Sequence, residues 1–212
     1  MYKKIIKRLL DILLSLAGLI VSAIPMAVIT LIIKKEDPGP AVFKQKRFGI
    51  HKSFFTLYKF RSMKLSTPHD VPTHQLEDPE QYLLKSGKFI RKYSLDELPQ
   101  LLNIFKGDMS VIGPRPALWN QDDLVADRDK YGANDVKPGL TGWAQINGRD
   151  ELPIPVKASY DGEYVKKMGP LFDLKCIFGT VKTVFKADGV VEGGNKDKES
   201  ENKDREYENK TI

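Results

Sequence analysis

The chain has 212 residues, with 34 Lys and Arg against 28 Asp and Glu and a formal net charge of +6. Its length suits one ordinary folded domain and excludes two large ones. The positive charge suits either nucleic acid or an anionic membrane surface. The single cysteine, Cys176, excludes an internal disulfide and a thiolate metal cluster. We expect this thiol to be buried and inert in a reducing compartment.

The first segment with a clear pattern covers residues 12–33 and carries no charged residue. As a helix rising about 1.5 Å per residue it reaches roughly 33 Å, enough to cross a bilayer. Basic residues flank it on both sides: Lys3, Lys4, Lys7 and Arg8 before it, and Lys34, Lys35, Lys44, Lys46 and Arg47 after it. Because basic flanks stay on the cytoplasmic side, we expect a re-entrant helix that bends near Pro25. A single membrane span is the main alternative, and a signal peptide is a weaker one.

Residues 41–47 and 53–60 alternate in apolar character around a turn that contains Gly49. This pattern predicts a β-hairpin, with Lys59 and Arg61 at its far end. Residues 67–80 are rich in Pro, His and acids, which indicates an exposed loop. Its histidines, His69 and His74, are expected to be solvated, since no further His or Cys is spaced to complete a metal site.

Helical spacing then predicts a helix over residues 79–92, interrupted near Gly87. A second helix is expected to start at Ser94 with a capping box that uses Glu97, and to end at Gly107. Residues 122–131 indicate a polar helix, and residues 139–148 form a glycine-punctuated segment around Trp143.

The pattern of residues 171–186 predicts an amphipathic helix, which either packs on the core or lies in a membrane interface. Residues 192–212 are expected to be a disordered tail because they carry many charges and no apolar period.

Adjacent acids such as Asp96 and Glu97 at a helix N-terminus are commonly structural, since they favour capping and the helix dipole. Their surroundings change this interpretation. Arg91 precedes them by five residues, and Arg115 lies between two prolines that stiffen its loop. Together with Lys59 and Arg61 of the hairpin, these cations converging on a carboxylate at a helix N-terminus indicate a diphosphate site.

Several motifs occur in a fixed order along the chain: FKQKRFG at 43–49, YKFRSM at 58–63, SLDELPQL at 94–101, GDMSVIGPRP at 107–116 and KPGLTGWAQINGR at 137–149. In this order the chain resembles the bacterial sugar transferase family, small monotopic polyprenyl-phosphate phosphoglycosyl transferases. The resemblance implies an α+β, mainly helical fold with a re-entrant membrane helix at 1–36, a catalytic domain at 37–191 and a tail at 192–212. It also implies a small β-hairpin and interfacial amphipathic helices.

The resemblance implies a two-step transfer in which Asp96 attacks the sugar-bearing phosphate of a UDP-sugar and releases UMP. Polyprenyl phosphate then takes the phosphosugar from the aspartyl intermediate. Glu97 is expected to act with Asp96 and to hold Mg²⁺. The expected phosphate-binding residues are Lys59, Arg61, Arg91 and Arg115, and the other possible substrate contacts are Gln145 and Arg149.

The implied location is the cytoplasmic face of the bacterial inner membrane, in the initiating step of surface glycan synthesis. The expected partners are the two substrates and membrane lipids, with downstream glycosyltransferases and a homo-oligomer as further possibilities. Nucleic acid is not expected, since the basic residues cluster beside the apolar segment. A nucleotide-sugar diphosphatase and a non-catalytic membrane scaffold remain as alternative functions.

Two departures from the family pattern stand out. Ile24 precedes Pro25 where many members have Ser, and residues 150–165 replace a tryptophan-containing stretch that could contribute to the choice of sugar. We expect Asp161, within that stretch, to be a surface acid of a helix.

Overall fold

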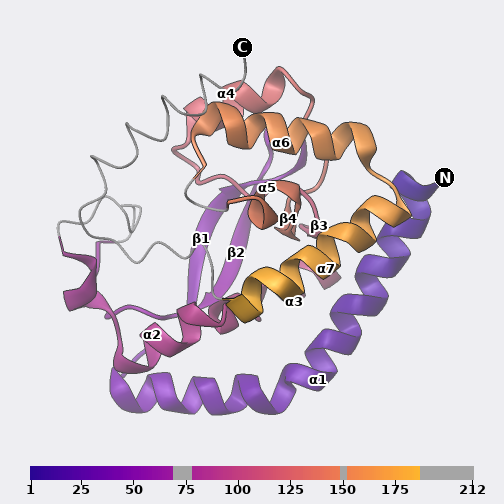
Figure 1. The fold of residues 1–212 in the computed structure, drawn as a ribbon. Coiled ribbons are helices and arrows are strands. Elements are labelled where there is room, and N and C mark those ends of the chain that lie inside the picture. Colours follow the sequence, from indigo (N-terminus) through magenta and orange to yellow (C-terminus); the bar gives the residue numbers. More distant parts are fainter. Residues whose placement is uncertain (69–77, 149–151, 187–212) are drawn as a thin grey trace.

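The computed structural model describes residues 1–68, 78–148 and 152–186. These residues are mainly helical, with one small antiparallel hairpin and one short parallel pair of strands. The hairpin lies in the middle of the molecule, with helices around it (Figure 1). In chain order the elements are α1 (Lys7–Glu36), β1 (Val42–Phe48), β2 (Phe54–Phe60), α2 (Lys85–Lys92), α3 (Gln100–Lys106), β3 (Ser110–Ile112), α4 (Asp122–Asp129), β4 (Gly139–Thr141), α5 (Trp143–Ile146), α6 (Ile154–Lys167) and α7 (Pro170–Lys186).

The long helix α1 bends and wraps around one side of the molecule (Figure 1). Pro25 is the proline inside it, and a proline removes one helical hydrogen bond and clashes with the preceding turn. The Ser22 hydroxyl donates to the Gly18 carbonyl at 2.6 Å, just before this break. Within the described residues α1 is the one helix long and apolar enough to cross a membrane.

Both ends of α1 are fixed to the rest of the chain by polar contacts. Near its start, Lys7 Nζ lies 2.7 Å from Asp173 of α7, and Asp11 accepts hydrogen bonds from the Ser110 hydroxyl and the Val111 backbone N–H. Near its end, Asp37 pairs with Arg61 just after β2, and Glu36 accepts from the backbone N–H groups that begin α2. The part of α1 after Pro25 also packs Ile29 and Ile33 against the hydrophobic core of Phe60, Leu84 and Ile90.

The predicted hairpin is confirmed, with Val42 opposite Phe60 and Phe48 opposite Phe54. The fully buried Asn103 joins it to α3. Its amide oxygen accepts from the Tyr58 backbone N–H at 3.1 Å, and its amide nitrogen donates to the Thr56 carbonyl at 2.7 Å. These two hydrogen bonds fix α3, and the turn before it, against β2.

The parallel pair of β3 and β4 was not expected from the sequence. Its strands have three residues each, too few for a periodic pattern. The two backbones approach closely, because a Cβ added at Gly139 would lie 2.1 Å from the Gly113 backbone nitrogen. The pair holds residues 113–116 at its end, where the Gly113 N–H donates to Thr141 and the Gly139 N–H donates to Pro114.

Several helix predictions hold and others need correction. The polar helix α4 and the amphipathic helix α7 are confirmed, as is the C-terminal cap Gly107, with a φ of 100°. The predicted interruption near Gly87 is wrong, since Gly87 lies inside α2 and the break falls at residues 83–84. Glycine is needed at that position because a Cβ there would meet the Ser62 carbonyl oxygen at 2.1 Å.

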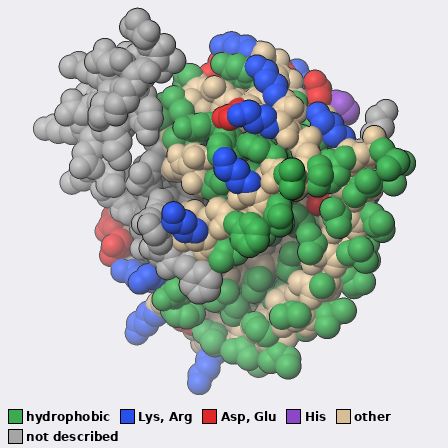
Figure 2. Space-filling view, turned by 45° about the vertical axis from the view of Figure 1, so that its right-hand side comes forward, with side chains coloured by type: hydrophobic (Ala, Val, Ile, Leu, Met, Phe, Trp, Pro, Cys, Tyr) green, Lys and Arg blue, Asp and Glu red, His purple; other side chains and the backbone are tan. Residues whose placement is uncertain are grey.

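The apolar residues of α7 divide between its two sides. Cys176 is fully buried, as expected, and burial raises the pKa of its thiol to about 12. The side that faces away from the core is also apolar, and its exposed residues are Leu171, Leu174, Phe178 and Val181. Apolar side chains follow α1 in the same way, along the right-hand and lower edge of the molecule (Figure 2).

The expectation that Asp161 is a surface acid is wrong. Asp161 lies in α6, is 1% exposed, and accepts two contacts from the Arg128 guanidinium of α4 at 2.8 and 2.6 Å. The remaining predictions for the loop with His69 and His74 and for the tail at 192–212 fall at least partly on residues 69–77 and 187–212, outside the described residues.

Candidate active site

Asp96 and Glu97 lie in a single 3₁₀ turn, Leu95–Glu97, between α2 and α3. The predicted capping box is wrong, because Ser94 has a left-handed backbone with a φ of 55° and makes no side-chain cap. Its carbonyl oxygen instead accepts from the Glu97 backbone N–H at 3.2 Å. The Glu97 side chain turns toward cations.

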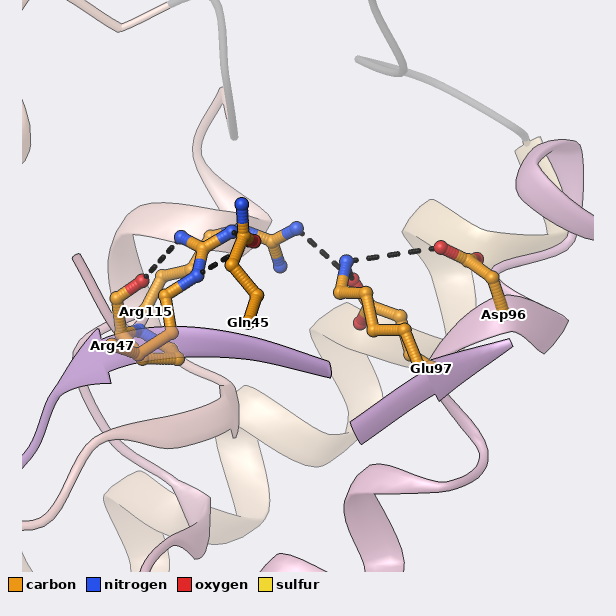
Figure 3. Close-up of polar contacts among 7 residues, drawn as sticks. Gln45, Arg47, Asp96, Glu97 and Arg115 are labelled. Carbon is orange, nitrogen blue, oxygen red and sulfur yellow. Dashed lines mark hydrogen bonds and ion pairs between the residues drawn. The ribbon is translucent and has the colours of Figure 1, made fainter. Parts of the chain in front are cut away.

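Two cations from distant parts of the chain meet the Glu97 carboxylate. Lys59 Nζ of β2 lies 3.1 Å from Glu97 Oε1, and Arg115 Nη2 lies 3.0 Å from the same oxygen. Lys59 also lies 3.7 Å from Asp96 Oδ2, which is an ion-pair distance but too long for a good hydrogen bond. Figure 3 shows these groups side by side, with Asp96 at one end and Arg115 beyond Glu97.

The loop that carries Arg115 is held from several directions. The Arg115 carbonyl oxygen accepts from Arg128 at 2.9 Å, and the Pro116 carbonyl oxygen accepts from Arg47 at 2.9 Å. Since Arg128 is itself fixed by the buried Asp161, its ion pair positions the Arg115 backbone. A loop with satisfied carbonyl groups presents its guanidinium in one orientation, which favours binding of an anion.

Burial and the local charges together set the pKa of Asp96. Burial raises the pKa of the Asp96 carboxyl and outweighs Lys59, which lowers it; the Glu97 charge raises it further. Arg91, in the last turn of α2, and Arg115 lower the pKa. Asp96 is thus a desolvated carboxylate among cations, 14% exposed, with no short hydrogen bond from them among the described residues.

The structure brings together Lys59, Arg91, Arg115, Asp96 and Glu97. Arg61 is not at this cluster. Its guanidinium contacts Asp37 and the Pro40 carbonyl oxygen at the end of α1, and it is 5% exposed. Lys59 and Arg61 have different surroundings because β2 ends between them. Lys59 lies in the strand, and Arg61 follows its last residue, Phe60.

The two further contacts expected from the sequence, Gln145 and Arg149, remain predictions. Gln145 is in α5, is 6% exposed, and neither polar atom of its side chain has a hydrogen-bond partner in the described structure. No hydrogen bond or ion pair in that part of the chain joins it to the acidic pair. Arg149 falls in residues 149–151, outside the described residues.

The acidic pair fits Mg²⁺ better than a metal held by protein ligands alone. Among the described residues, no group of three or more His, Cys, Asp and Glu side chains is placed to hold a metal. Mg²⁺, however, commonly binds through one or two carboxylates and completes its shell with water and substrate phosphates. Burial is the main cause of the raised pKa of Asp96, and the Glu97 charge adds to it. A cation bound by the two carboxylates would relieve their mutual repulsion.

Sequence reasoning missed three residues that the structure adds around this site. Arg128 and Asp161 support the Arg115 loop through a buried pair, and nothing in the sequence links their helices. Gln45 lies beside Arg115 in Figure 3 and accepts a hydrogen bond from Arg47. The strand alternation of the predicted hairpin was the signal for Gln45, since it shares a face with Lys59.

The chain matches the model of one protein family, described as bacterial sugar transferase, over residues 2–187. It is 40% identical over 186 residues to EpsL of Bacillus subtilis, an uncharacterized sugar transferase, covering 88% of this chain and 90% of that protein. It is 35% identical over 200 residues to the undecaprenyl-phosphate galactose phosphotransferase of Salmonella typhimurium, covering 88% of this chain and 42% of that protein.

A third relative is the UDP-glucose:undecaprenyl-phosphate glucose-1-phosphate transferase of Escherichia coli, 36% identical over 191 residues, which are 84% of this chain and 40% of that protein. The chain therefore spans most of the Bacillus protein and about two fifths of the other two. The motifs around Asp96 and Arg115 lie within the matched residues. By this match the chain belongs to the bacterial sugar transferase family.

Proposed function

We propose that this chain transfers a sugar 1-phosphate from a UDP-sugar to polyprenyl phosphate, as the initiating step of a bacterial surface glycan. The products are polyprenyl-diphosphate-sugar and UMP. The observation that carries this proposal is the Asp96–Glu97 pair with Lys59 and Arg115 on it, in a chain of the bacterial sugar transferase family. Relatives at 35 and 36% identity are undecaprenyl-phosphate sugar phosphotransferases, which supports the expected class of phosphoglycosyl transferase.

In the first step, a carboxylate oxygen of Asp96 attacks the sugar-bearing phosphorus of the UDP-sugar. The bond between that phosphorus and the bridging oxygen breaks, and the electron pair leaves with UMP. The product on the protein is an aspartyl phosphosugar, a mixed anhydride that stays reactive. The surroundings of Asp96 suit this role. Its carboxylate is largely removed from water, and Lys59 lies at 3.7 Å, too far for a strong hydrogen bond.

In the second step, a phosphate oxygen of the polyprenyl phosphate attacks the same phosphorus. The bond to Asp96 breaks, and the carboxylate is regenerated. Charge on the phosphoryl oxygens in both transition states calls for fixed cations. Lys59, Arg91 and Arg115 supply them, and Glu97 holds the Lys59 and Arg115 side chains in place through one carboxylate oxygen.

Mg²⁺, when bound by Asp96 and Glu97, would neutralise the diphosphate of the donor and ease departure of UMP. The protein's own cations hold the remaining phosphate oxygens. Arg61 has no part in this proposal, because its contacts with Asp37 and Pro40 serve to attach the end of α1.

We propose a re-entrant, monotopic placement of α1 at the cytoplasmic face of the inner membrane. Contacts at its two ends support this topology, since Lys7 and Asp11 bind one part of the globular region and Glu36 and Asp37 bind another. A straight span would put one end across the bilayer from the domain that both ends contact. The exposed apolar side of α7 supports its interfacial alternative over simple core packing.

Acceptor dependence distinguishes the proposed transferase from the alternative diphosphatase. The purified protein, with Mg²⁺ and a panel of UDP-sugars, should release UMP continuously only when undecaprenyl phosphate is present. Mass analysis should find the lipid diphosphate sugar as product and, without acceptor, a phosphosugar on the peptide containing Asp96. Continuous release of nucleotide without acceptor would support the diphosphatase, and no release with any donor would support the scaffold.

The proposed topology has its own test. Lys3→Cys and Lys35→Cys place thiols at exposed positions on either side of the apolar segment. The native Cys176 gives little background, because its thiol is buried. A membrane-impermeant reagent added to sealed inside-out vesicles should label both variants equally; labelling of one variant only would mean that α1 spans the membrane.

A further inference from the structure

The hairpin places several polar side chains of one of its faces next to the acidic pair. Lys59 of β2 lies opposite Phe43 of β1, and Gln45 lies opposite Leu57. Since residues two apart on a strand share a face, Gln45 and Arg47 lie on the same face as Lys59, while Lys44 lies on the other. Gln45 is half-buried there, whereas Lys44 is exposed.

The orientation of the Gln45 carboxamide is fixed by its neighbour. Arg47 donates to Gln45 Oε1 from Nε at 3.1 Å and from Nη2 at 2.6 Å, and from Nη1 to the Pro116 carbonyl oxygen at 2.9 Å. A guanidinium only donates, so the atom that faces it must be the amide oxygen. The NH₂ group of Gln45 therefore points away from Arg47, and within the described residues no acceptor receives its hydrogens.

The position of this NH₂ group relative to the acids decides what it can contact. In Figure 3 Asp96 lies at one end of the cluster, followed by Glu97, then Arg115 and Gln45. Lys59 contacts both acids. In a phosphoryl transfer the attacking and leaving oxygens lie roughly in line on opposite sides of the phosphorus. With Asp96 as the nucleophile, the groups beyond Glu97 lie on the side from which the nucleotide leaves.

We propose that Gln45 is a substrate-binding residue for the nucleoside monophosphate half of the donor, with Arg47 as its positioning residue. The Gln45 NH₂ donates to an acceptor oxygen of the nucleotide, next to the Arg115 guanidinium. This proposal rests on the proposed function, because the nucleotide side is defined by attack from Asp96. The fixed amide costs little entropy on binding, which is the advantage of a pre-organised donor.

A structural role for Gln45 makes a different prediction from a binding role. If the amide only braces Arg47 against Pro116, then Gln45→Glu should be tolerated, because a carboxylate accepts the same two bonds from Arg47 more strongly. If the NH₂ group binds nucleotide, the same variant loses its donors and adds a negative charge beside the phosphate. Gln45→Met removes both the brace and the donors and keeps a similar volume.

The experiment measures inhibition of the full-length protein by added UMP and the KM for UDP-sugar and for undecaprenyl phosphate. We expect the inhibition constant for UMP and the KM for UDP-sugar to rise about tenfold or more in Gln45→Glu and Gln45→Met, the loss typical of a hydrogen bond to a charged group. The KM for undecaprenyl phosphate should stay within about twofold, since the acceptor binds after UMP has left and carries no nucleoside for Gln45 to contact. Lys44→Ala is the matched control on the opposite face and should leave all three constants unchanged.

The outcomes separate this inference from the function on which it rests. Wild-type activity with unchanged UMP inhibition in both Gln45 variants would overturn the inference alone. Loss in Gln45→Met with full retention in Gln45→Glu would assign Gln45 a purely bracing role and also overturn it. Absence of UMP release in the wild type would refute the proposed function. If Gln45→Glu fails to fold by thermal denaturation, Gln45→Met decides: a higher UMP constant with an unchanged KM for undecaprenyl phosphate supports binding, and an unchanged UMP constant or an equal loss for both substrates overturns it.

Discussion

Asp161 and Asp96 are both acids whose pKa is raised by burial, yet their surroundings differ. Asp161 receives the Arg128 guanidinium at 2.8 and 2.6 Å and is 1% exposed. Asp96 has Lys59 at 3.7 Å and is 14% exposed. A paired and enclosed carboxylate stabilises one packing arrangement, whereas a desolvated one with its cations slightly too far away remains available to a ligand.

The same contrast separates a third acid from the site. Asp173 accepts from the Tyr2 hydroxyl at 2.6 Å, from Lys7 at 2.7 Å and from the Tyr164 hydroxyl at 2.9 Å. Like Asp161, Asp173 lies within short hydrogen-bonding distance of its partners. Its ion pair with Lys7 joins α7 to the start of α1. The distances to the partners, rather than burial alone, therefore distinguish structural acids from the candidate nucleophile.

The largest effect is expected from Asp96→Asn. Transfer should fall by about a thousandfold or more, because an amide cannot form the acyl phosphate. Stability at neutral pH should not fall, because the variant removes a charge whose burial is unfavourable. The measurements are UMP release with undecaprenyl phosphate and the Tm of the detergent-purified protein.

Asp122→Asn is the matched control for that experiment. Asp122 is exposed in the first turn of α4, so the change removes a helix N-terminal acid without touching the site. Its activity should equal the wild type. Retention of full transfer by Asp96→Asn, or a loss of both Tm and activity as large as that of a core variant, would end the assignment of Asp96 as nucleophile.

The opposite result is expected for Asp161→Ala. The Arg128 guanidinium would stay buried without its partner, and breaking such a pair costs about 3–5 kcal/mol. The free energy of unfolding should fall by that amount in denaturant titrations, and activity should fall with it because Arg115 loses its support.

A double variant separates the structural part of this effect. Arg128→Met with Asp161→Leu replaces the pair by apolar groups, and such replacements are often neutral or stabilising. We expect stability to return while transfer stays reduced, since residue 128 then no longer donates to the Arg115 carbonyl oxygen. If transfer returned together with stability, Arg128 would have no positioning role.

The contrast between these acids also marks how far the sequence was informative. The bend at Pro25, the hairpin, α4, α7 and the meeting of Lys59, Arg91 and Arg115 at Asp96 follow from periodicity, proline chemistry and motif content. The three-residue strands and the Arg128–Asp161 pair depend on contacts between segments far apart in the chain, which carry no local signal. The capping pattern at Ser94 was misleading because this residue has a left-handed backbone in the structure.

Glu97→Gln tests the acidic pair at the level of the metal. The amide keeps a similar shape but holds cations less well, so we expect the Mg²⁺ concentration for half-maximal activity to rise about tenfold. Maximal activity at saturating Mg²⁺ should fall less, although Lys59 and Arg115 lose a charged partner. An unchanged Mg²⁺ dependence would place the metal away from Glu97.

The smallest effect is a difference in pH dependence between Asp96 and its Asn variant. Because the pKa of Asp96 is raised in the folded state, its protonated form contributes stability that is fully present below the unfolded pKa and is lost as pH rises through the folded pKa. Wild type and Asp96→Asn should therefore have similar Tm values near ~pH 4, and the variant should be about 2–4 °C more stable near ~pH 7.5. Only the ionised carboxylate attacks phosphorus. As pH is lowered, the wild-type transfer rate should therefore begin to fall at a higher pH than the pKa of an ordinary aspartate would give. A wild type that gains stability over the variant as pH rises would mean that the cations outweigh burial at Asp96, which would make this carboxylate a structural partner like Asp161.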